Sequence, residues 1–216
     1  MPEVNALCTT TVVGGGPPIA AGYAFAQQYR KENRVTVCFI GDGATNEGSF
    51  HEALNLASVW RLPAIFVCEN NLYAGAQRYE QHTRSPNIAD RAAGYAMPGT
   101  VVDGNDALAV YRSAQEARAR AVAGEGPTLI EYKTYRWHGH GESDLQLYQP
   151  RDEIAAWQAL CPIPKLRAEM LAEGLIGRDE LQELESRIEA IVKDAVRFAE
   201  ESPYPEPGEA LEDVFA

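Results

Sequence analysis

Short β-rich runs alternate with helical patterns through the first part of this chain, which is typical of a parallel sheet whose strands are joined by crossover helices. Residues 35–40 and 64–68 are apolar, β-rich runs that predict two buried strands. The apolar residues between them recur at helical spacing and predict a crossover helix over residues 47–60. This βαβ unit indicates an α/β fold, a doubly wound parallel sheet.

The residues on either side of this βαβ unit predict further helices and a further strand. Pro17 and Pro18 stand where a helix can begin, and apolar spacing continues that helix to about Lys31. Residues 106–122 predict a further helix and residues 128–134 a further strand. The segment 72–98 has little periodicity, so we expect an irregular loop with a short helix there.

The character of the chain changes near Pro150, where strand signals stop and helical ones take over. We therefore expect an α/β domain over residues 1–149 and a C-terminal helical extension over residues 150–216. From Leu171 to Ala216, thirteen acidic and four basic residues give −9 of the chain's net charge of −12. We interpret this charge as a solvated helix face, and an acid-specific docking site is the alternative.

Composition narrows the class of protein. Hydrophobic residues make up 45% of the chain, so a packed core is expected. The apolar stretches are too short for a membrane span, the N-terminus does not resemble a secretory signal, and an isoelectric point of about 4.8 gives no basic footprint for nucleic acid. The cysteines show no close pairing, so we expect reduced thiols in a cytoplasmic protein. They are Cys8, Cys38, Cys68 and Cys161.

Polar residues and glycines follow two of the predicted strands. Gly41-Asp42-Gly43 ends the first strand and Asn70-Asn71 the second, and in a parallel sheet both motifs lie at the carboxyl edge, where ligands bind. Asp42 offers a carboxylate oxygen and Asn71 an amide oxygen to a hard cation such as Mg²⁺, while the glycines let the backbone approach a phosphate. Gly41-Asp42-Gly43 alone is also typical of a tight turn, and the second motif at this spacing favours the ligand site.

The spacing of these motifs resembles a known fingerprint. Gly41-Asp42-Gly43, twenty-six intervening residues and Asn70-Asn71 are similar to the signature of thiamin-diphosphate-binding proteins. Residues 41–48, 69–73 and 133–140 together resemble the alpha subunits of thiamin-dependent 2-oxo acid and acetoin dehydrogenases. This resemblance extends from about Asn5 to Phe215 and implies a thiamin-diphosphate-binding α/β fold.

The resemblance implies a metal and diphosphate site at the strand ends. The Mg²⁺ ligands would be Asp42, the side chain of Asn71 and the backbone carbonyl of Tyr73. The diphosphate would lie against Gly41, Gly43 and Ala44, and the Val12-Val13-Gly14 backbone would meet the aminopyrimidine ring. Taken without the resemblance, the glycines at 14–16 would be a flexible lead into a helix.

The resemblance also implies roles for the loop that follows the predicted strand 128–134. Arg136 would contact the diphosphate, for which a guanidinium supplies a permanent forked donor, and His140 would be the active-site histidine near the reacting carbon. Taken alone, His138 and His140 are exposed loop histidines or part of a transition-metal site. A zinc site is disfavoured because only His51 and His82 remain and no cysteine pair accompanies them.

The family implies an activity and partners. The chain would be the alpha subunit of an enzyme that cleaves acetoin or a 2-oxo acid such as pyruvate and passes the acyl unit to lipoyl-lysine of a transacylase, with a disulfide as acceptor. Residues 13–18 and 46–52 look closest to the acetoin branch, with pyruvate and branched-chain oxo acids as rivals. A beta subunit in a heterotetramer would supply the activating glutamate. A transketolase-like enzyme and a catalytically silent structural subunit are the alternatives.

Two departures from the family pattern carry expectations. Alpha subunits have a segment before the position of Asn5, with an aromatic and arginine pair that helps to hold the diphosphate, so we expect another polypeptide to supply it or cofactor affinity to be weaker. Gly141 stands where regulated mitochondrial subunits carry a phosphorylated serine. We therefore expect no phosphorylation switch at that position.

Overall fold

The computed structural model describes residues 5, 6 and 10–212. It divides into two compact units, Met1–Leu166 and Arg167–Ala216, and each is described here by itself. Among the described residues, the cysteines at 38, 68 and 161 form no disulfide, and Cys8 lies outside the described residues. None of the helices that the structure describes combines the length and apolar composition that crossing a bilayer requires.

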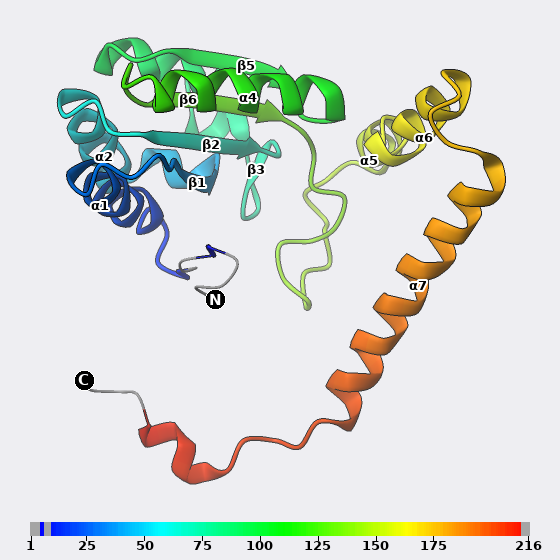
Figure 1. Ribbon diagram of the computed structural model, residues 1–216. Helices are drawn as coiled ribbons and strands as arrows, with labels where there is room; N and C mark the ends of the chain where they lie inside the picture. The colour runs from blue at the N-terminus through cyan, green and yellow to red at the C-terminus, as the bar shows by residue number, and fades with distance from the viewer. Residues whose placement is uncertain (1–4, 7–9, 213–216) are drawn as a thin grey trace. The chain divides into compact units, whose positions relative to one another are not determined.

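The first unit is built on a four-stranded parallel sheet in the order β1-β2-β6-β5 (Figure 1). Its strands are β1 (Thr36–Gly41), β2 (Ala64–Asn70), β6 (Thr128–Lys133) and β5 (Gly99–Asp103). Thr36 pairs with Ala64, and Ile65 pairs with Thr128, so the three strands predicted from the sequence lie side by side. The predicted α/β fold with a parallel sheet is confirmed.

Helices cover both faces of this sheet (Figure 1). On one face α1 (Gly16–Tyr29) and α2 (Gly48–Val59) pack with Phe66 of β2 in a cluster that includes the fully buried Phe50 and Leu54. On the other face Ala117 of α4 (Ala107–Val122) packs with Val67 and Ile130. Because neighbouring side chains of a strand point to opposite faces, β2 contributes to both clusters, as a central strand of a doubly wound sheet should.

Between β2 and β5 the chain is irregular, as its lack of periodicity predicts. It holds two-residue strands β3 (Tyr73–Ala74) and β4 (Gln77–Arg78), the one-turn helix α3 (Tyr79–His82) and the 3₁₀ helix η3 (Ala89–Tyr95). Strand β5 has no counterpart among the predicted elements. It is an edge strand, and four of its five residues are exposed, so it lacks the apolar pattern that reveals β1 and β2.

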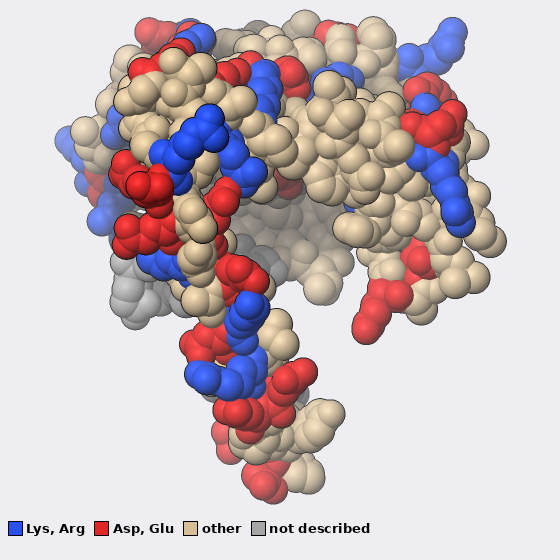
Figure 2. Space-filling view, turned by 90° about the vertical axis from the view of Figure 1, so that its right-hand side faces the viewer, with Lys and Arg blue, Asp and Glu red and all other residues tan. Residues whose placement is uncertain are grey.

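Between β6 and residue 212, where the described part of the chain ends, every regular element is helical. These elements are α5 (Arg151–Gln158), α6 (Pro162–Ala172), α7 (Arg178–Glu201) and the 3₁₀ helix η4 (Pro207–Leu211). Helix α7 lies in the predicted C-terminal helical extension, and none of its residues is buried. In Figure 2, acidic and basic side chains are interspersed over this C-terminal part, and the charged pairs in α7 include Lys193 with Glu189 at 2.7 Å.

Candidate functional site

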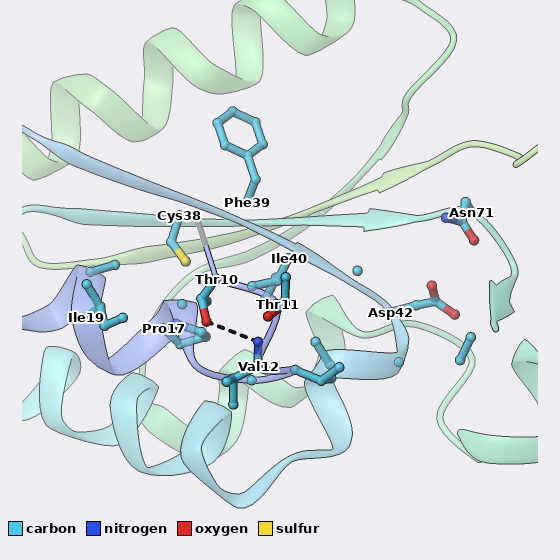
Figure 3. A pocket seen from close by; sticks show the side chains of 18 of the residues that line it. Thr10, Thr11, Val12, Pro17, Ile19, Cys38, Phe39, Ile40, Asp42 and Asn71 are labelled. Atoms are coloured by element: carbon cyan, nitrogen blue, oxygen red, sulfur yellow. Dashed lines mark hydrogen bonds between the residues drawn. The ribbon is translucent and has the colours of Figure 1, made fainter. Parts of the chain in front are cut away.

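The carboxyl ends of β1, β2 and β6 open into a cavity of about 830 Å³. Figure 3 shows Asp42 just beyond the end of β1 and Asn71 just beyond the end of β2, at the same edge of the sheet. All nine residues for which the sequence predicted a cofactor or metal role line this one cavity. They are Val13, Gly41, Asp42, Gly43, Ala44, Asn71, Tyr73, Arg136 and His140.

Asp42 is the buried acid of the cavity. It precedes the short 3₁₀ helix η2 (Gly43–Asn46), its backbone carbonyl accepts a hydrogen bond from Thr45 Oγ1 at 2.6 Å, and it is only 1% exposed. Burial raises the pKa of its carboxyl group, and the nearby His82 opposes that rise. Oδ2 of Asp42 lies 3.1 Å from Nε2 of His82, a residue that the sequence did not single out for this site.

The two asparagines after β2 have different surroundings. Asn70 is fully buried, and its Nδ2 donates to Oε1 of Glu131 at 2.6 Å, while its Oδ1 accepts from the backbone N–H of Leu72. Asn71 lines the cavity, and its Oδ1 accepts from the backbone N–H of Tyr73 at 3.1 Å. Asn70 therefore fixes the turn from within the core, and Asn71 presents its amide to the cavity.

A buried acid below the site supports this turn. Glu131 in β6 is fully buried, accepts from the backbone N–H of Ala89 at 2.9 Å, and lies 2.7 Å from Nζ of Lys133. A buried carboxylate is tolerated when its oxygens are paired in this way. Glu131 thus joins β6, the end of β2 and the start of η3 beneath the cavity.

Tyr73 is 2% exposed, and its hydroxyl group bonds a residue of α5. Its hydroxyl donates to Oε2 of Glu153 at 3.2 Å, and Arg78 donates to the same carboxylate oxygen at 2.7 Å. Burial, with the Glu153 charge second, raises the pKa of Tyr73 to about 12. The side chain of Tyr73 is therefore neutral and fixed.

The loop after β6 brings Arg136 and His140 to the cavity. Arg136 donates to the carbonyl oxygen of Gly75 at 2.8 Å and to the hydroxyl of Tyr148 at 2.7 Å. It also donates, over the longer distance of 3.4 Å, to the backbone carbonyl oxygen of Tyr73. His140 is exposed and its backbone N–H donates to Asp144 at 2.7 Å. His138 is exposed too, but it does not line the cavity.

Asp144 organises that loop. Its carboxylate accepts from the hydroxyl of Tyr148 and from the backbone N–H groups of Gln146 and His140. These donors, the Tyr148 hydroxyl first, lower the pKa of Asp144 to about 2. The loop is thus tied together by side-chain hydrogen bonds around one ionised acid.

Two glycines permit close approach of backbone segments at the cavity. Gly14 has φ +78°, and a Cβ there would lie 2.6 Å from Cβ of Glu47. Its carbonyl oxygen accepts from Ser49 Oγ at 2.8 Å, so the glycine run is a fixed turn before α1 and not a flexible lead. A Cβ on Gly43 would lie 2.7 Å from Cβ of Ala74, whereas a Cβ on Gly41 would meet open space.

The donor chemistry of the cavity suits a hard cation. A buried carboxylate, a side-chain amide and a backbone carbonyl, contributed by Asp42, Asn71 and Tyr73, are all oxygen donors. Within the described part of the chain, no group of three or more His, Cys, Asp or Glu side chains is arranged to hold a metal ion. The three oxygen donors fit a hard cation whose remaining ligands come from a phosphorylated molecule.

Sequence reasoning missed the residues that support the site. His82 and Glu131 lie 40 and 61 residues from their partners Asp42 and Asn70, and Glu153 and Tyr148 lie after the last strand. His82 also falls in the segment without periodicity. The one available signal is Glu131, because an acid in an otherwise apolar strand run requires a buried partner.

This arrangement, a doubly wound parallel sheet with an oxygen-lined cavity at its carboxyl edge, defines a class of α/β proteins that bind phosphorylated cofactors there. A family model described as the dehydrogenase E1 component matches residues 2–208, and the chain belongs to this family. The resemblance seen in the sequence motifs is thereby confirmed.

Several curated relatives are alpha subunits of such enzymes. The chain is 46% identical over 205 residues to the alpha subunit of acetoin:2,6-dichlorophenolindophenol oxidoreductase of Bacillus subtilis (strain 168), which covers 94% of the chain and 61% of the relative. It is 41% identical over 220 residues to the chloroplastic pyruvate dehydrogenase E1 component subunit alpha-3 of Arabidopsis thaliana, covering 99% of the chain and 51% of the relative. It is 41% identical over 211 residues to the 2-oxoisovalerate dehydrogenase subunit alpha of Bacillus subtilis, covering 95% and 64%. The chain thus spans between half and two thirds of these relatives' length.

Proposed function

We propose that this chain forms the magnesium and thiamin-diphosphate site of an E1 dehydrogenase alpha subunit. The observation that carries the proposal is the convergence of all nine predicted site residues on one cavity at the carboxyl edge of the sheet. Family membership supports the same cofactor. When bound, thiamin diphosphate supplies the nucleophilic carbon and the electron sink for cleaving a bond next to a carbonyl.

The strand-end residues hold the charged part of the cofactor in this proposal. Asp42, the Asn71 amide oxygen and the Tyr73 carbonyl bind Mg²⁺, and Gly41, Gly43 and Ala44 line the diphosphate. Support comes from the buried carboxylate of Asp42 and from the fixed Tyr73, whose side chain is held by Glu153. A metal ion also offsets the cost of keeping the Asp42 carboxylate ionised in a buried position.

In this proposal the backbone near Val13 and the loop that carries Arg136 and His140 contact the other parts of the cofactor. The backbone at Val13, next to the fixed turn at Gly14, meets the aminopyrimidine ring. Arg136 contacts the diphosphate with its forked guanidinium, and His140 handles protons near the reacting carbon. Both side chains line the same cavity, and their loop is partly exposed.

Acetoin is the substrate that we favour. The acetoin-oxidising relative shares 46% identity with the chain, against 41% for the pyruvate and the 2-oxoisovalerate enzymes. The sequence runs 13–18 and 46–52 point in the same direction. Pyruvate and branched-chain oxo acids are the competing substrates in the test below.

The proposal includes two protein partners. A beta subunit completes the site and supplies the glutamate that activates the aminopyrimidine, because no acid of this chain is assigned to that role. A lipoyl-bearing transacylase component accepts the acyl unit through its disulfide. The alpha-subunit names of the relatives support the first partner, and the lipoyl acceptor follows from the proposed reaction.

Reconstitution tests this function. The purified chain should not turn over acetoin, pyruvate or a branched-chain oxo acid by itself. It should do so with a beta subunit, Mg²⁺, thiamin diphosphate and a lipoyl domain, fastest with acetoin. Turnover by the chain alone, with contaminants excluded by mass spectrometry, would contradict the shared site. Activity on sugar phosphates without a lipoyl domain would favour a transketolase-like enzyme, and cofactor binding without any turnover would favour a structural subunit.

A further inference from the structure

His82 lies directly against the buried carboxylate of the cavity. It ends the one-turn helix α3, and its side chain is 9% exposed, against 2% for that of Asp42. Nε2 of His82 lies 3.1 Å from Oδ2 of Asp42. The two residues are 40 positions apart, so this contact ties the irregular segment after β2 to the end of β1.

The other ring nitrogen of His82 shows which atom carries the proton. Arg91 donates to Oδ1 of Asn46 at 2.8 Å, and because a guanidinium has only donors, this bond fixes the orientation of the Asn46 amide. The Nδ2 group of Asn46 therefore faces Nδ1 of His82, at 3.1 Å. An amide NH₂ can only donate, so Nδ1 is an acceptor and Nε2 carries the hydrogen that is donated to Asp42.

The hydroxyl of Thr83 is compatible with this assignment. Its Oγ1 lies 3.0 Å from Nδ1 of His82, and a hydroxyl rotates to donate where an acceptor is present. Arg91, Asn46, His82 and Asp42 thus form a directed chain of hydrogen bonds that ends on the carboxylate. Through this chain the imidazole donates from Nε2 and orients the Asp42 carboxylate.

The hydrogen bond from Nε2 of His82 occupies one oxygen of Asp42 and fixes the orientation of its carboxylate. Carboxylates that bind metal ions are commonly held in this way by hydrogen bonds from outer partners, and the loss of such a partner weakens metal binding. We propose that His82, oriented by Asn46, is a positioning residue that holds Asp42 for Mg²⁺; this inference rests on the metal site proposed above.

Metal affinity tests the inference without relying on turnover. The full chain is dialysed to equilibrium against Mn²⁺ with excess thiamin diphosphate, and the Mn²⁺ on both sides is measured by electron paramagnetic resonance after acidification. His82→Leu removes the donor and should raise the half-saturating Mn²⁺ concentration about ten- to a hundredfold. His82→Gln can accept from Asn46 and donate to Asp42 through one amide, so it should stay within about threefold of the parent.

Matched variants separate the possible failures. Asp42→Asn reports on the metal site itself, and His51→Gln alters a partly buried histidine of α2 that bonds Tyr95 outside the cavity. Circular dichroism checks that each variant is folded. His51→Gln should bind like the parent, and Asp42→Asn should lose binding.

The outcomes are distinguishable. Parent-like affinity of His82→Leu, with binding lost in Asp42→Asn, overturns the role of His82 and leaves the proposed function standing. Equal losses in His82→Leu and His82→Gln also overturn it, because then the ring and not its hydrogen bonds matters. Parent-like affinity of Asp42→Asn removes the metal site and this inference together. If His82→Leu does not fold, Asn46→Leu decides: it should weaken Mn²⁺ binding, and unchanged affinity contradicts the hydrogen-bond chain.

Discussion

Two walls of the same cavity are held in place by different means. The metal wall, defined as Asp42, Asn71 and Tyr73, stands on strand ends whose neighbours are buried in the core. The loop wall, defined as residues 136–148, has exposed members such as His140 and is tied together by side-chain hydrogen bonds around Asp144. The fold itself therefore places the proposed metal ligands, whereas polar contacts within the loop place Arg136 and His140.

The acids of the two walls show the same contrast. Burial raises the pKa of Asp42, while the donors around the half-buried Asp144 lower its pKa to about 2. A carboxyl group with a raised pKa is costly to ionise, and a bound cation relieves that cost. A carboxylate with a lowered pKa stabilises its own surroundings. This contrast supports the proposed role of Asp42 as a metal ligand, whereas Asp144 holds the loop together.

The largest effect should follow from removing the metal wall. Asp42→Ala should weaken magnesium-dependent binding of thiamin diphosphate by at least about a hundredfold, beyond the typical loss for an outer partner of a metal ligand, and Asn71→Ala should act in the same direction. Isothermal titration calorimetry measures the change. Glu116→Ala, an exposed acid of α4, is the matched control and should bind like the parent. Tight binding by a folded Asp42→Ala variant would show that the metal wall is assigned wrongly.

Filling the space at the turn after β1 should have the next largest effect. Gly43→Val places a Cβ within 2.7 Å of Cβ of Ala74, so the turn or β3 must shift. Overpacking of this kind costs about 1–3 kcal/mol of unfolding free energy, which urea denaturation measures. Gly41→Val is a matched comparison because its Cβ would meet open space, although β-branching there still narrows the cavity. Equal stability of both variants would mean that the contact with Ala74 is not tight in solution.

Two variants of the loop wall should separate the binding of thiamin diphosphate from the chemical steps. Arg136→Ala removes charge-assisted hydrogen bonds to phosphate and should raise the dissociation constant of thiamin diphosphate about tenfold or more. His140→Ala should leave that constant nearly unchanged and slow turnover of the reconstituted enzyme, since an imidazole near the reacting carbon acts on protons. Arg112→Ala on α4 controls for the loss of an exposed positive charge. Similar losses of cofactor affinity in both loop variants would show that Arg136 and His140 do not have the separate roles proposed here.

The smallest expected effect concerns the acid of the loop. The pKa of Asp144 is lowered from the ordinary aspartate value of about 3.9. Its ionised form therefore stabilises the loop fully at pH values above about 3.9, and this contribution is lost as the pH falls toward 2. Tyr148→Phe removes the donor with the largest influence and should raise the pKa of Asp144 toward its ordinary value. Carbon-13 NMR of the carboxyl groups follows the titration. An unchanged midpoint would assign the lowered pKa to the backbone donors alone.

The same contrast decides what could be predicted from the sequence. Strands β1, β2 and β6 and the helices between them follow from apolar runs and helical spacing, because a doubly covered sheet requires apolar side chains on both faces. The motifs at the ends of β1 and β2 then meet at one edge by topology alone. Asp42 and Asn71 could therefore be brought together from the sequence.

The supporting contacts could not be predicted in this way. His82 reaches Asp42 from a segment without periodicity. Its partner Asn46, and Arg91, which orients Asn46, belong to separate short helices. Strand β5 is not predicted from the sequence because most of its side chains are exposed, so it lacks an apolar pattern. Hydrogen bonds between distant segments depend on the folded positions of single side chains, for which no repeating pattern exists.

The proposed function depends on Asp42, Asn71 and Tyr73 binding the metal ion together. The most direct test is anomalous diffraction from a crystal of the full chain with Mn²⁺ and thiamin diphosphate, with data collected above the manganese absorption edge. We predict one strong anomalous peak at about 2.0–2.2 Å from a carboxylate oxygen of Asp42, Oδ1 of Asn71 and the carbonyl oxygen of Tyr73. A cofactor-bound manganese ion that contacts other residues of the chain, with Asp42 still turned to His82 alone, would contradict the account.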